Sequence, residues 1–299
     1  MIDLVIVGTI GLDDIKTPFG EVKEVLGGSA VYAGLSAALF AKPALVSIIG
    51  SDLPPKYLAL MKKGGLDIEG ISRDKKTFRW SGLYEFDMSE AETLKTELNA
   101  LAKFNPDVPK KYRRAKFLFL ANTDPTVQLK TLNQMENHPL VLTDTMNYWI
   151  KHKRKILEKV IARSDIVLLN DGEARQFAGD FNLVKAAKKV LNLGAKHVIV
   201  KKGEHGALLF SPKSHFSAPG YPLEQLKDPT GAGDSFAGTL IGYLAKTKTV
   251  SERRIRQGII YASAVASFVV EEFSVDALLK INRQKLKERY EIFKEIRKF

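Results

Sequence analysis

The sequence predicts an α/β fold, a three-layer αβα sandwich around a mostly parallel central sheet. Short apolar runs rich in β-branched residues alternate along the chain with longer segments of helical periodicity. Most of the short runs are apolar throughout, as expected for strands that are covered on both faces. The chain has 299 residues, enough for one large domain, and no proline-rich or serine-rich linker divides it.

The expected elements follow one another in a regular order. Strands are expected at 4–8, 44–50, 116–121, 140–144, 165–170, 197–202 and 207–210. Helices are expected at 29–41, 54–64, 126–136, 151–163, 182–193, 233–246, 251–270 and 282–298. Several of these helices are preceded by Asp, Asn or Ser, whose side chains accept hydrogen bonds from the free amides at a helix start.

An aromatic segment interrupts this alternation. In KKTFRWSGLYEFDMS, rings at even spacing would share one face of a strand, with Gly82 in the remaining place of that face. The rings are Phe78, Trp80, Tyr84 and Phe86. Such a strand would bury its rings in the core or in a dimer contact, or it would belong to a small sheet folded over a pocket.

Composition excludes several classes of function. The chain has no cysteine, which excludes a disulfide framework, thiolate zinc sites and a cysteine nucleophile. No segment approaches the roughly 20 apolar residues that cross a bilayer, and MIDLVIVGTIGLDD lacks the basic start of a signal peptide. We therefore expect a cytoplasmic protein with no membrane partner. The formal charge is +12, but acids are interspersed among the basic residues and no nucleic-acid motif is present, so we expect no nucleic-acid partner.

The most informative stretch is LKDPTGAGDSFAGTL. Gly231 and Gly233 permit backbone angles that other residues avoid, and the residues after them have the spacing of a buried helix. The turn would present unpaired amides at a helix N-terminus, a site that binds oxyanions through the amides and the helix dipole. No lysine follows the glycines as in a P-loop, and the glycine spacing differs from that of a dinucleotide fingerprint.

Asp234 lies at the start of this helix, where a carboxylate would repel a bound phosphate. Its position is useful if the acid orients an attacking hydroxyl and takes its proton, while the amides hold the phosphoryl group. The alternative is that Asp234 only caps the helix.

DPTGAGDSFAG resembles the C-terminal signature of the ribokinase-like, or PfkB, carbohydrate kinases, and the resemblance covers nearly the whole chain. It implies a ribokinase-like sandwich with a small β lid. The single domain would span 1–299, with lid segments at about 12–28 and 67–100 inserted in it. In the family, the acid of this signature activates the substrate hydroxyl, and the amides that correspond to Ala232, Gly233 and Asp234 form the anion hole. The corresponding catalytic residues here are Gly231, Ala232, Gly233 and Asp234.

Two further motifs concern the metal and the nucleotide. NDGE is similar to the family's NxxE motif, which implies that Asn170 and Glu173 bind Mg²⁺ and its waters. The alternative is an ordinary helix start with a cap at Asn170 or Asp171. VKKGEHGALLF resembles the family's VxKGxxG segment, although the residues alone predict only a hairpin. The expected ATP contacts are Lys201, Lys202, Gly203, Glu204, Gly206 and Thr230.

GTIGLDDI resembles the family's first strand with the acid that binds sugar hydroxyls, and LGGSAVYAGLSAALF is similar to its GG signature. Tyr32 stands where many members carry an asparagine, which leaves the identity of the sugar open. Polar strand ends are also expected to face the pocket. The expected substrate residues are Asp13, Gly27, Gly28, Tyr32, Asn122 and Asp144. The alternative for Asp13 is a strand end in solvent.

Together these features predict an ATP-dependent, Mg²⁺-requiring kinase that transfers the γ-phosphoryl group to a hydroxyl of a sugar or related polyol. A nucleoside (adenosine-like) kinase and an inositol kinase are alternatives within the family. A non-catalytic sugar-sensing binder is an alternative from another class. The sequence leaves open the acceptor, a monovalent-cation requirement and a homodimer.

Overall fold

The computed structural model describes residues 2–88 and 90–298. The larger of its two sheets has nine strands in the described part of the chain, in the order β13-β12-β11-β10-β9-β8-β1-β4-β5. They are β1 (Leu4–Val7), β4 (Pro43–Gly50), β5 (Asp67–Asp74), β8 (Phe117–Leu120), β9 (Leu140–Thr143), β10 (Ile166–Asn170), β11 (His197–Lys201), β12 (Ala207–Phe210) and β13 (His215–Ala218). The pairs β11–β12 and β12–β13 are antiparallel, and the other neighbouring strands pair parallel.

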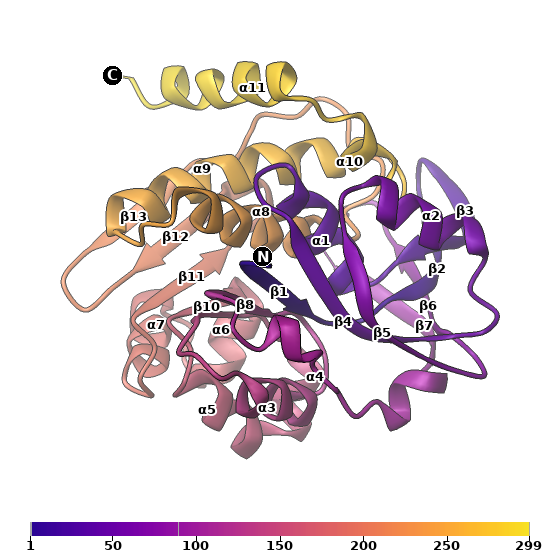
Figure 1. Cartoon of the computed structure of the whole chain (residues 1–299). Helices are drawn as coiled ribbons and strands as arrows, with labels where there is room; N and C mark the ends of the chain where they lie inside the picture. Colours follow the sequence, from indigo (N-terminus) through magenta and orange to yellow (C-terminus); the bar gives the residue numbers. More distant parts are fainter. Residues whose placement is uncertain (1, 89, 299) are drawn as a thin grey trace.

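Helices cover both faces of this sheet and complete the three expected layers (Figure 1). One face carries α1 (Ser29–Ala38), α2 (Pro55–Lys63), α8 (Ala232–Thr247), α9 (Glu252–Val269), α10 (Asp276–Lys280) and α11 (Arg283–Ile296). The other carries α3 (Pro125–Gln134), α4 (Asn147–His152), α5 (Arg154–Ile161), α6 (Asp171–Ala178) and α7 (Leu183–Leu191). No helix in the described part of the chain combines the length and apolar character needed to span a membrane.

All seven predicted strands are present in the large sheet, but the sequence missed β5 and β13. Eight helices were expected, and each has a counterpart. The helix expected at 151–163 is divided into α4 and α5 around Lys153. Helix α6 was expected only as the helix-start alternative for NDGE, and α10 was not expected. The side chains of Asp124, Asn182, Ser251 and Asn282 accept amide hydrogen bonds at the starts of α3, α7, α9 and α11.

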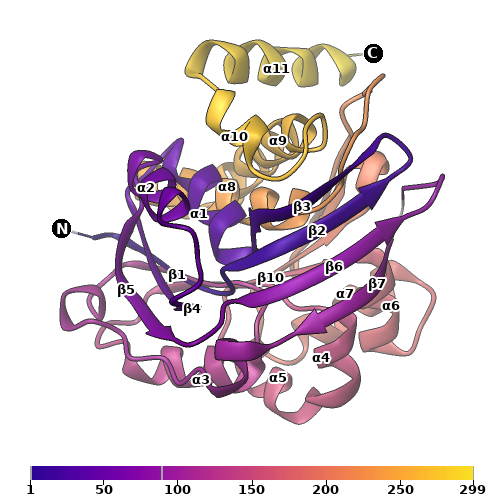
Figure 2. The same ribbon diagram turned by 90° about the vertical axis from the view of Figure 1, so that its right-hand side faces the viewer.

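A second sheet of four strands lies beside the first, in the order β3-β2-β6-β7 (Figure 2). Its strands are β2 (Gly11–Thr17), β3 (Gly20–Gly27), β6 (Phe78–Tyr84) and β7 (Ala91–Glu97). From the range 67–100 it takes only β6 and β7, because β5 pairs with β4 in the large sheet. Ile68 and Ile71 of β5 pack against the main core, which explains this placement.

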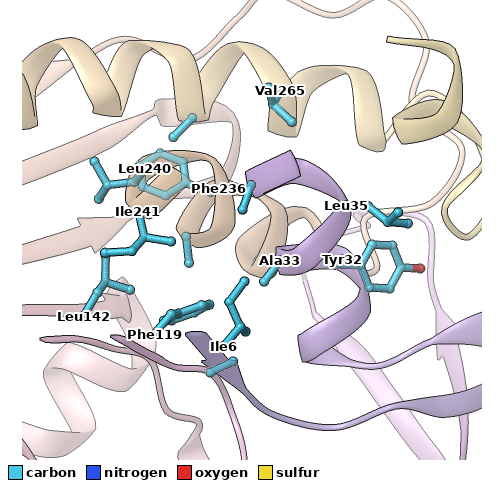
Figure 3. Close-up of a cluster of buried hydrophobic side chains, with 14 of the residues drawn as sticks. Ile6, Tyr32, Ala33, Leu35, Phe119, Leu142, Phe236, Leu240, Ile241 and Val265 are labelled. Atoms are coloured by element: carbon cyan, nitrogen blue, oxygen red, sulfur yellow. The ribbon is translucent and has the colours of Figure 1, made fainter. Parts of the chain in front are cut away.

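Helices α1 and α8 pack closely at the centre of the molecule, within the cluster that Figure 3 shows. A Cβ atom on Gly238 would lie 2.2 Å from the carbonyl oxygen of Ala33, and one on Gly242 would lie 2.8 Å from the Cα of Ala37. Any side chain on either glycine would therefore push the helices apart. The contacts advance in the same direction along both helices, so the two helices are parallel and their N-termini lie on the same side.

Candidate active site

The turn before α8 has a conformation that requires glycine. Gly231, the N-cap of α8, has φ 76° and ψ 0°, in the left-handed region that other residues avoid. A Cβ atom there would lie 2.3 Å from Cδ1 of Tyr32, in the first turn of α1. The buried Asp228 fixes the turn, because its Oδ1 accepts the amide of Thr230 at 2.9 Å and its Oδ2 accepts the amide of Ser274 at 3.2 Å.

Two amides at this helix start have no acceptor in the described part of the chain, those of Gly233 and Asp234. The amide of Ala232 donates to the carbonyl oxygen of Pro229 at 3.2 Å, so one of the three expected anion-hole amides is already used. Free amides at a helix N-terminus, together with the helix dipole, form a binding site for an oxyanion.

The carboxylate of Asp234 also has no hydrogen bond or ion pair within the described residues. The pKa of Asp234 is raised to about 7, chiefly by burial and also by the nearby charge of Asp144, while Lys201 partly offsets both. A carboxyl group with a pKa near neutrality can accept a proton from an alcohol at physiological pH more readily than an ordinary aspartate.

Lys201, the last residue of β11, lies beside the free amides. Its Nζ donates to Oδ2 of Asp144 at 2.9 Å, and the two side chains are 18% and 4% exposed. A Cβ atom built on Gly233 would lie 3.1 Å from this Nζ. Burial alone would lower the pKa of Lys201, but Asp144, Glu173 and Asp234 raise it above its usual value, so the side chain is an ammonium.

Asp13 on β2 meets the two glycines that precede α1. A Cβ atom on Gly27 would lie 1.7 Å from Oδ2 of Asp13, so only glycine fits under this carboxylate. Gly28 is the N-cap of α1 with φ 98°, and a hydrogen bond from its amide lowers the pKa of Asp13. The effect of burial is larger and, together with the charges of Asp228 and Asp234, raises the pKa of Asp13 to about 8. Asp13 is buried, which excludes the solvent-exposed strand end.

Two tyrosines face this group of acids. The fully buried hydroxyl of Tyr32 has no hydrogen-bond partner in the described part of the chain. Tyr84 reaches from β6 to the glycine turn, where its hydroxyl accepts a hydrogen bond from the side chain of Thr230 at 3.3 Å, and the residue is 8% exposed. The second sheet therefore touches the turn that holds the free amides.

Two further rings of the aromatic segment, those of Trp80 and Phe86, lie in different surroundings. A Cβ atom on Gly82 would lie 2.2 Å from Cη2 of Trp80, so the indole ring of Trp80 occupies the place left by this glycine. Phe86 lies beyond the end of β6 and is 94% exposed, so it does not share a buried face with Tyr84. The expected aromatic face is therefore limited to β6 itself.

Comparisons with known proteins show the family of this chain. The model of the pfkB family carbohydrate kinases matches residues 1–282. The chain belongs to the pfkB family. A cytidine kinase of Thermococcus kodakarensis is 31% identical over 260 residues, which cover 84% of this chain and 92% of that protein. The pfkB-family chain is a phosphotransferase that acts on a sugar or nucleoside hydroxyl, and a non-catalytic sugar sensor is not favoured.

Solved structures show the same ribokinase fold. A putative ribokinase II from E. coli, in complex with ATP and Mg²⁺, has a TM-score of 0.79 at 20% identity and covers 99% of this chain and 100% of its own. A fructokinase from Vibrio cholerae O395, bound to fructose, ADP and calcium, has a TM-score of 0.80 at 18% identity, with coverages of 97% and 99%. At these identities the likeness concerns the fold alone.

In this pfkB-family kinase, NDGE begins α6 as a capping box. The side chain of Asn170 accepts the amide of Glu173 at 2.7 Å, and Oε2 of Glu173 accepts the amide of Asn170 at 2.7 Å. The helix-start alternative is therefore correct, and the metal role stays a prediction. Oε1 of Glu173 has no partner in the described part of the chain, and such an oxygen fits Mg²⁺. Burial, with Asp144, raises the pKa of Glu173.

The predicted hairpin between β11 and β12 is present, with η3 (Gly203–His205) in its turn. Gly206 has φ 82°, and a Cβ atom there would lie 2.1 Å from the carbonyl oxygen of Ala218, so glycine is required. The side chain of Glu204 is 87% exposed and Lys202 is partly exposed. Of the expected nucleotide residues, Lys201 and Thr230 lie beside the free amides, and the others belong to this turn.

Both polar side-chain atoms of Asn122, another expected substrate residue, already have partners. Its Oδ1 accepts a hydrogen bond from Nε1 of Trp149 at 3.1 Å, and its Nδ2 donates to Sδ of Met146 at 3.3 Å.

The sequence alone identified neither Asp228 as a site residue nor the partner of Thr230. The signal for Asp228 was present, since it is the first residue of the DPTGAGD motif.

Proposed function

We propose that this kinase transfers the γ-phosphoryl group of ATP to a hydroxyl of a sugar, either free or within a nucleoside, with Asp234 as the general base. The observation that carries the proposal is the unpaired carboxylate of Asp234 next to the unpaired amides of Gly233 and Asp234. The amides would hold the phosphoryl oxygens, and the carboxylate would orient the acceptor hydroxyl and take its proton.

The acceptor would lie between the start of α1 and the second sheet, which we propose is a lid of the single domain. The carboxyl group of Asp13 lies over Gly27, and the unpartnered hydroxyl of Tyr32 is available to the same ligand. A carboxyl group can form hydrogen bonds with two hydroxyls of a polyol. Tyr84 closes the lid side and would keep water away from the transferring group.

Mg²⁺ would be held by Glu173, with Asn170 fixing the orientation of that side chain through the capping box. When bound, Mg²⁺ neutralises charge on the phosphate oxygens of the nucleotide. No group of three or more His, Cys, Asp and Glu side chains in the described residues could hold a metal alone, so phosphate and water oxygens would complete its coordination. The turn around Gly203 and Gly206 would carry the nucleotide.

Of these two kinds of acceptor, the nucleoside is favoured by the similarity to one relative. The relative from Thermococcus kodakarensis, matched over 92% of its own length, is a cytidine kinase. Trp80 on β6 is partly exposed and supplies a ring on which a base could stack. A monovalent-cation requirement, a homodimer and a cytoplasmic location stay predictions from the sequence.

The test is an acceptor screen with the purified chain, ATP and Mg²⁺. ADP release would be followed with pentoses, hexoses, keto-acids, inositol, cytidine and adenosine, and each product would be identified by mass spectrometry. We expect a phosphorylated sugar or nucleoside, and product formation at least about 10²-fold slower with Asp234→Asn at the same protein concentration. Calorimetric binding of an acceptor by the wild-type chain with no product from any compound would contradict the proposal.

A further inference from the structure

We infer that Lys201 binds the phosphoryl group during its transfer, and that Asp144 positions Lys201 for this purpose. The inference rests on the proposed function, because it assigns two residues to the same reaction. It replaces the roles that the sequence suggested, a nucleotide contact for Lys201 and a substrate contact for Asp144.

The ammonium of Lys201 lies close to an unpaired amide. Its Nζ would lie 3.1 Å from a Cβ atom on Gly233, whose own amide has no acceptor in the described part of the chain. A cation and a free amide therefore lie side by side at the start of α8. An oxyanion bound to the amides of Gly233 and Asp234 would come into contact with this ammonium.

Hydrogen bonds hold both the side chain and the backbone of Asp144 in place. Its Oδ2 accepts the Lys201 ammonium at 2.9 Å, and its Oδ1 accepts the amide of Thr145 at 3.0 Å. The backbone is held as well, because its carbonyl oxygen accepts Nε2 of Gln128 at 3.0 Å and its amide donates to Leu120 at 2.9 Å. Both carboxylate oxygens are engaged and the residue is buried, so its arrangement suits holding a lysine better than binding a sugar.

The energetics of burial favour a functional role for the ion pair of Lys201 and Asp144 over a purely stabilising one. A buried ion pair is weak evidence for stability, since its desolvation often cancels its Coulombic attraction. A fixed, largely desolvated cation is effective where negative charge develops in a transition state, because it needs no reorganisation at that moment. Lys201 has both properties, with 18% of its side chain exposed and a carboxylate that fixes its direction.

The chemical step is balanced without any further reactant. The acceptor oxygen forms a bond to the γ-phosphorus as the bond from that phosphorus to the bridging oxygen of ADP breaks. The hydroxyl proton goes to Asp234, and the leaving electron pair stays on ADP. Lys201 keeps its proton throughout and stabilises the equatorial oxygens of the phosphoryl group, on which the transition-state charge is spread.

The test uses Lys201→Met, Lys201→Arg and Asp144→Asn. Lys196→Met is the matched control, since Lys196 precedes the same strand and pairs with Asp165 at 2.7 Å, but its side chain is 73% exposed. Binding of ADP and of a non-hydrolysable ATP analogue is measured by calorimetry without acceptor. Steady-state kinetics with an acceptor from the screen then give kcat and KM separately, and thermal melting checks the fold.

For Lys201→Met we expect kcat to fall by about 10²-fold to 10³-fold, as for other oxyanion donors, with the acceptor KM within a few-fold. Affinity for the ATP analogue should fall at least about fivefold more than affinity for ADP, because only the analogue carries a γ-phosphoryl group. Lys201→Arg should recover part of kcat. Asp144→Asn should lower kcat by about tenfold or more while nucleotide affinity changes less, and Lys196→Met should match wild type.

Equal losses of ADP and analogue affinity in Lys201→Met, with kcat within about threefold of wild type, would overturn the inference and leave Lys201 a purely structural residue. If Lys201→Met does not fold, unchanged kcat and unchanged binding selectivity in Asp144→Asn would overturn it equally. The binding measurements need no acceptor. They therefore still test Lys201 if the acceptor screen fails, which would instead count against the proposed function.

Discussion

The pH dependence of turnover gives a quantitative test of Asp234. A general base must be ionised in the free enzyme, so kcat/KM should fall as the pH drops below the pKa of this carboxyl group. The pKa of Asp234 is raised to about 7, chiefly by burial and then by Asp144. The perturbations are therefore a change of pH and the substitution Asp234→Asn, which removes the titrating group but keeps the size of the side chain.

The expected size of the pH effect on kcat/KM follows from the pKa of Asp234. At pH 5.5 a group with a pKa of about 7 is ionised in only about 3% of molecules, so kcat/KM should be about 30-fold below its plateau above pH 8. An aspartate with an ordinary pKa of about 3.9 would be fully ionised over this range, which predicts a flat profile. Asp234→Asn should lower kcat by about 10²-fold to 10⁴-fold at the plateau.

The assay measures initial rates of ADP release between pH 5.5 and 9, with the acceptor from the screen and saturating ATP and Mg²⁺. The linking enzymes must be shown to be in excess at each pH, and residual activity after return to pH 8 controls for denaturation. A flat wild-type profile would refute the raised pKa. Near-normal turnover by folded Asp234→Asn with the true acceptor would refute the base assignment itself.

Three further substitutions have defined outcomes. Gly231→Ala should lower the melting temperature and reduce kcat at least about tenfold, since its φ is 76° and its Cβ would lie 2.3 Å from Tyr32, and unchanged values would contradict this. Asp13, with a pKa raised to about 8, holds a proton in the native state that the unfolded chain loses above about pH 4, so its contribution to stability falls as pH rises to 8. Asp13→Asn should therefore melt at a higher temperature than wild type at pH 8.5 and differ little at pH 5; a lower melting temperature at pH 8.5 would oppose this. Tyr84→Phe should raise the acceptor KM several-fold through loss of the contact with Thr230, and an unchanged KM would separate the lid from acceptor binding.

The sequence predicted most strands of the central sheet because these strands have a distinctive apolar composition. Strands that are covered on both faces are continuous apolar runs, such as LVIV in β1 and FLFL in β8. Strand β5 has the sequence DIEGISRD and lies at the sheet edge, where charged residues are tolerated, so it lacked that signal. Helix α6 begins directly after β10 at Asp171, so the capping residues of NDGE were its only signal in the sequence.

The site was predicted as a set of motifs, but their partners were not. Asp144 and Lys201 are 57 residues apart, and Tyr84 and Thr230 are 146 apart, so no local pattern could pair them. The glycine turn was predicted as an anion site from its residues alone. That Ala232 uses its amide for a turn depends on backbone angles, which the sequence does not specify.

The most direct test of the central claim is a crystal structure of the chain with ADP, Mg²⁺, the true acceptor and a metal fluoride that mimics the phosphoryl group. We predict fluorine atoms within about 3.1 Å of the amide nitrogens of Gly233 and Asp234, and an acceptor hydroxyl within about 3 Å of the Asp234 carboxylate. A fluoride bound away from these amides, or an acceptor hydroxyl that contacts another residue instead of Asp234, would contradict the account.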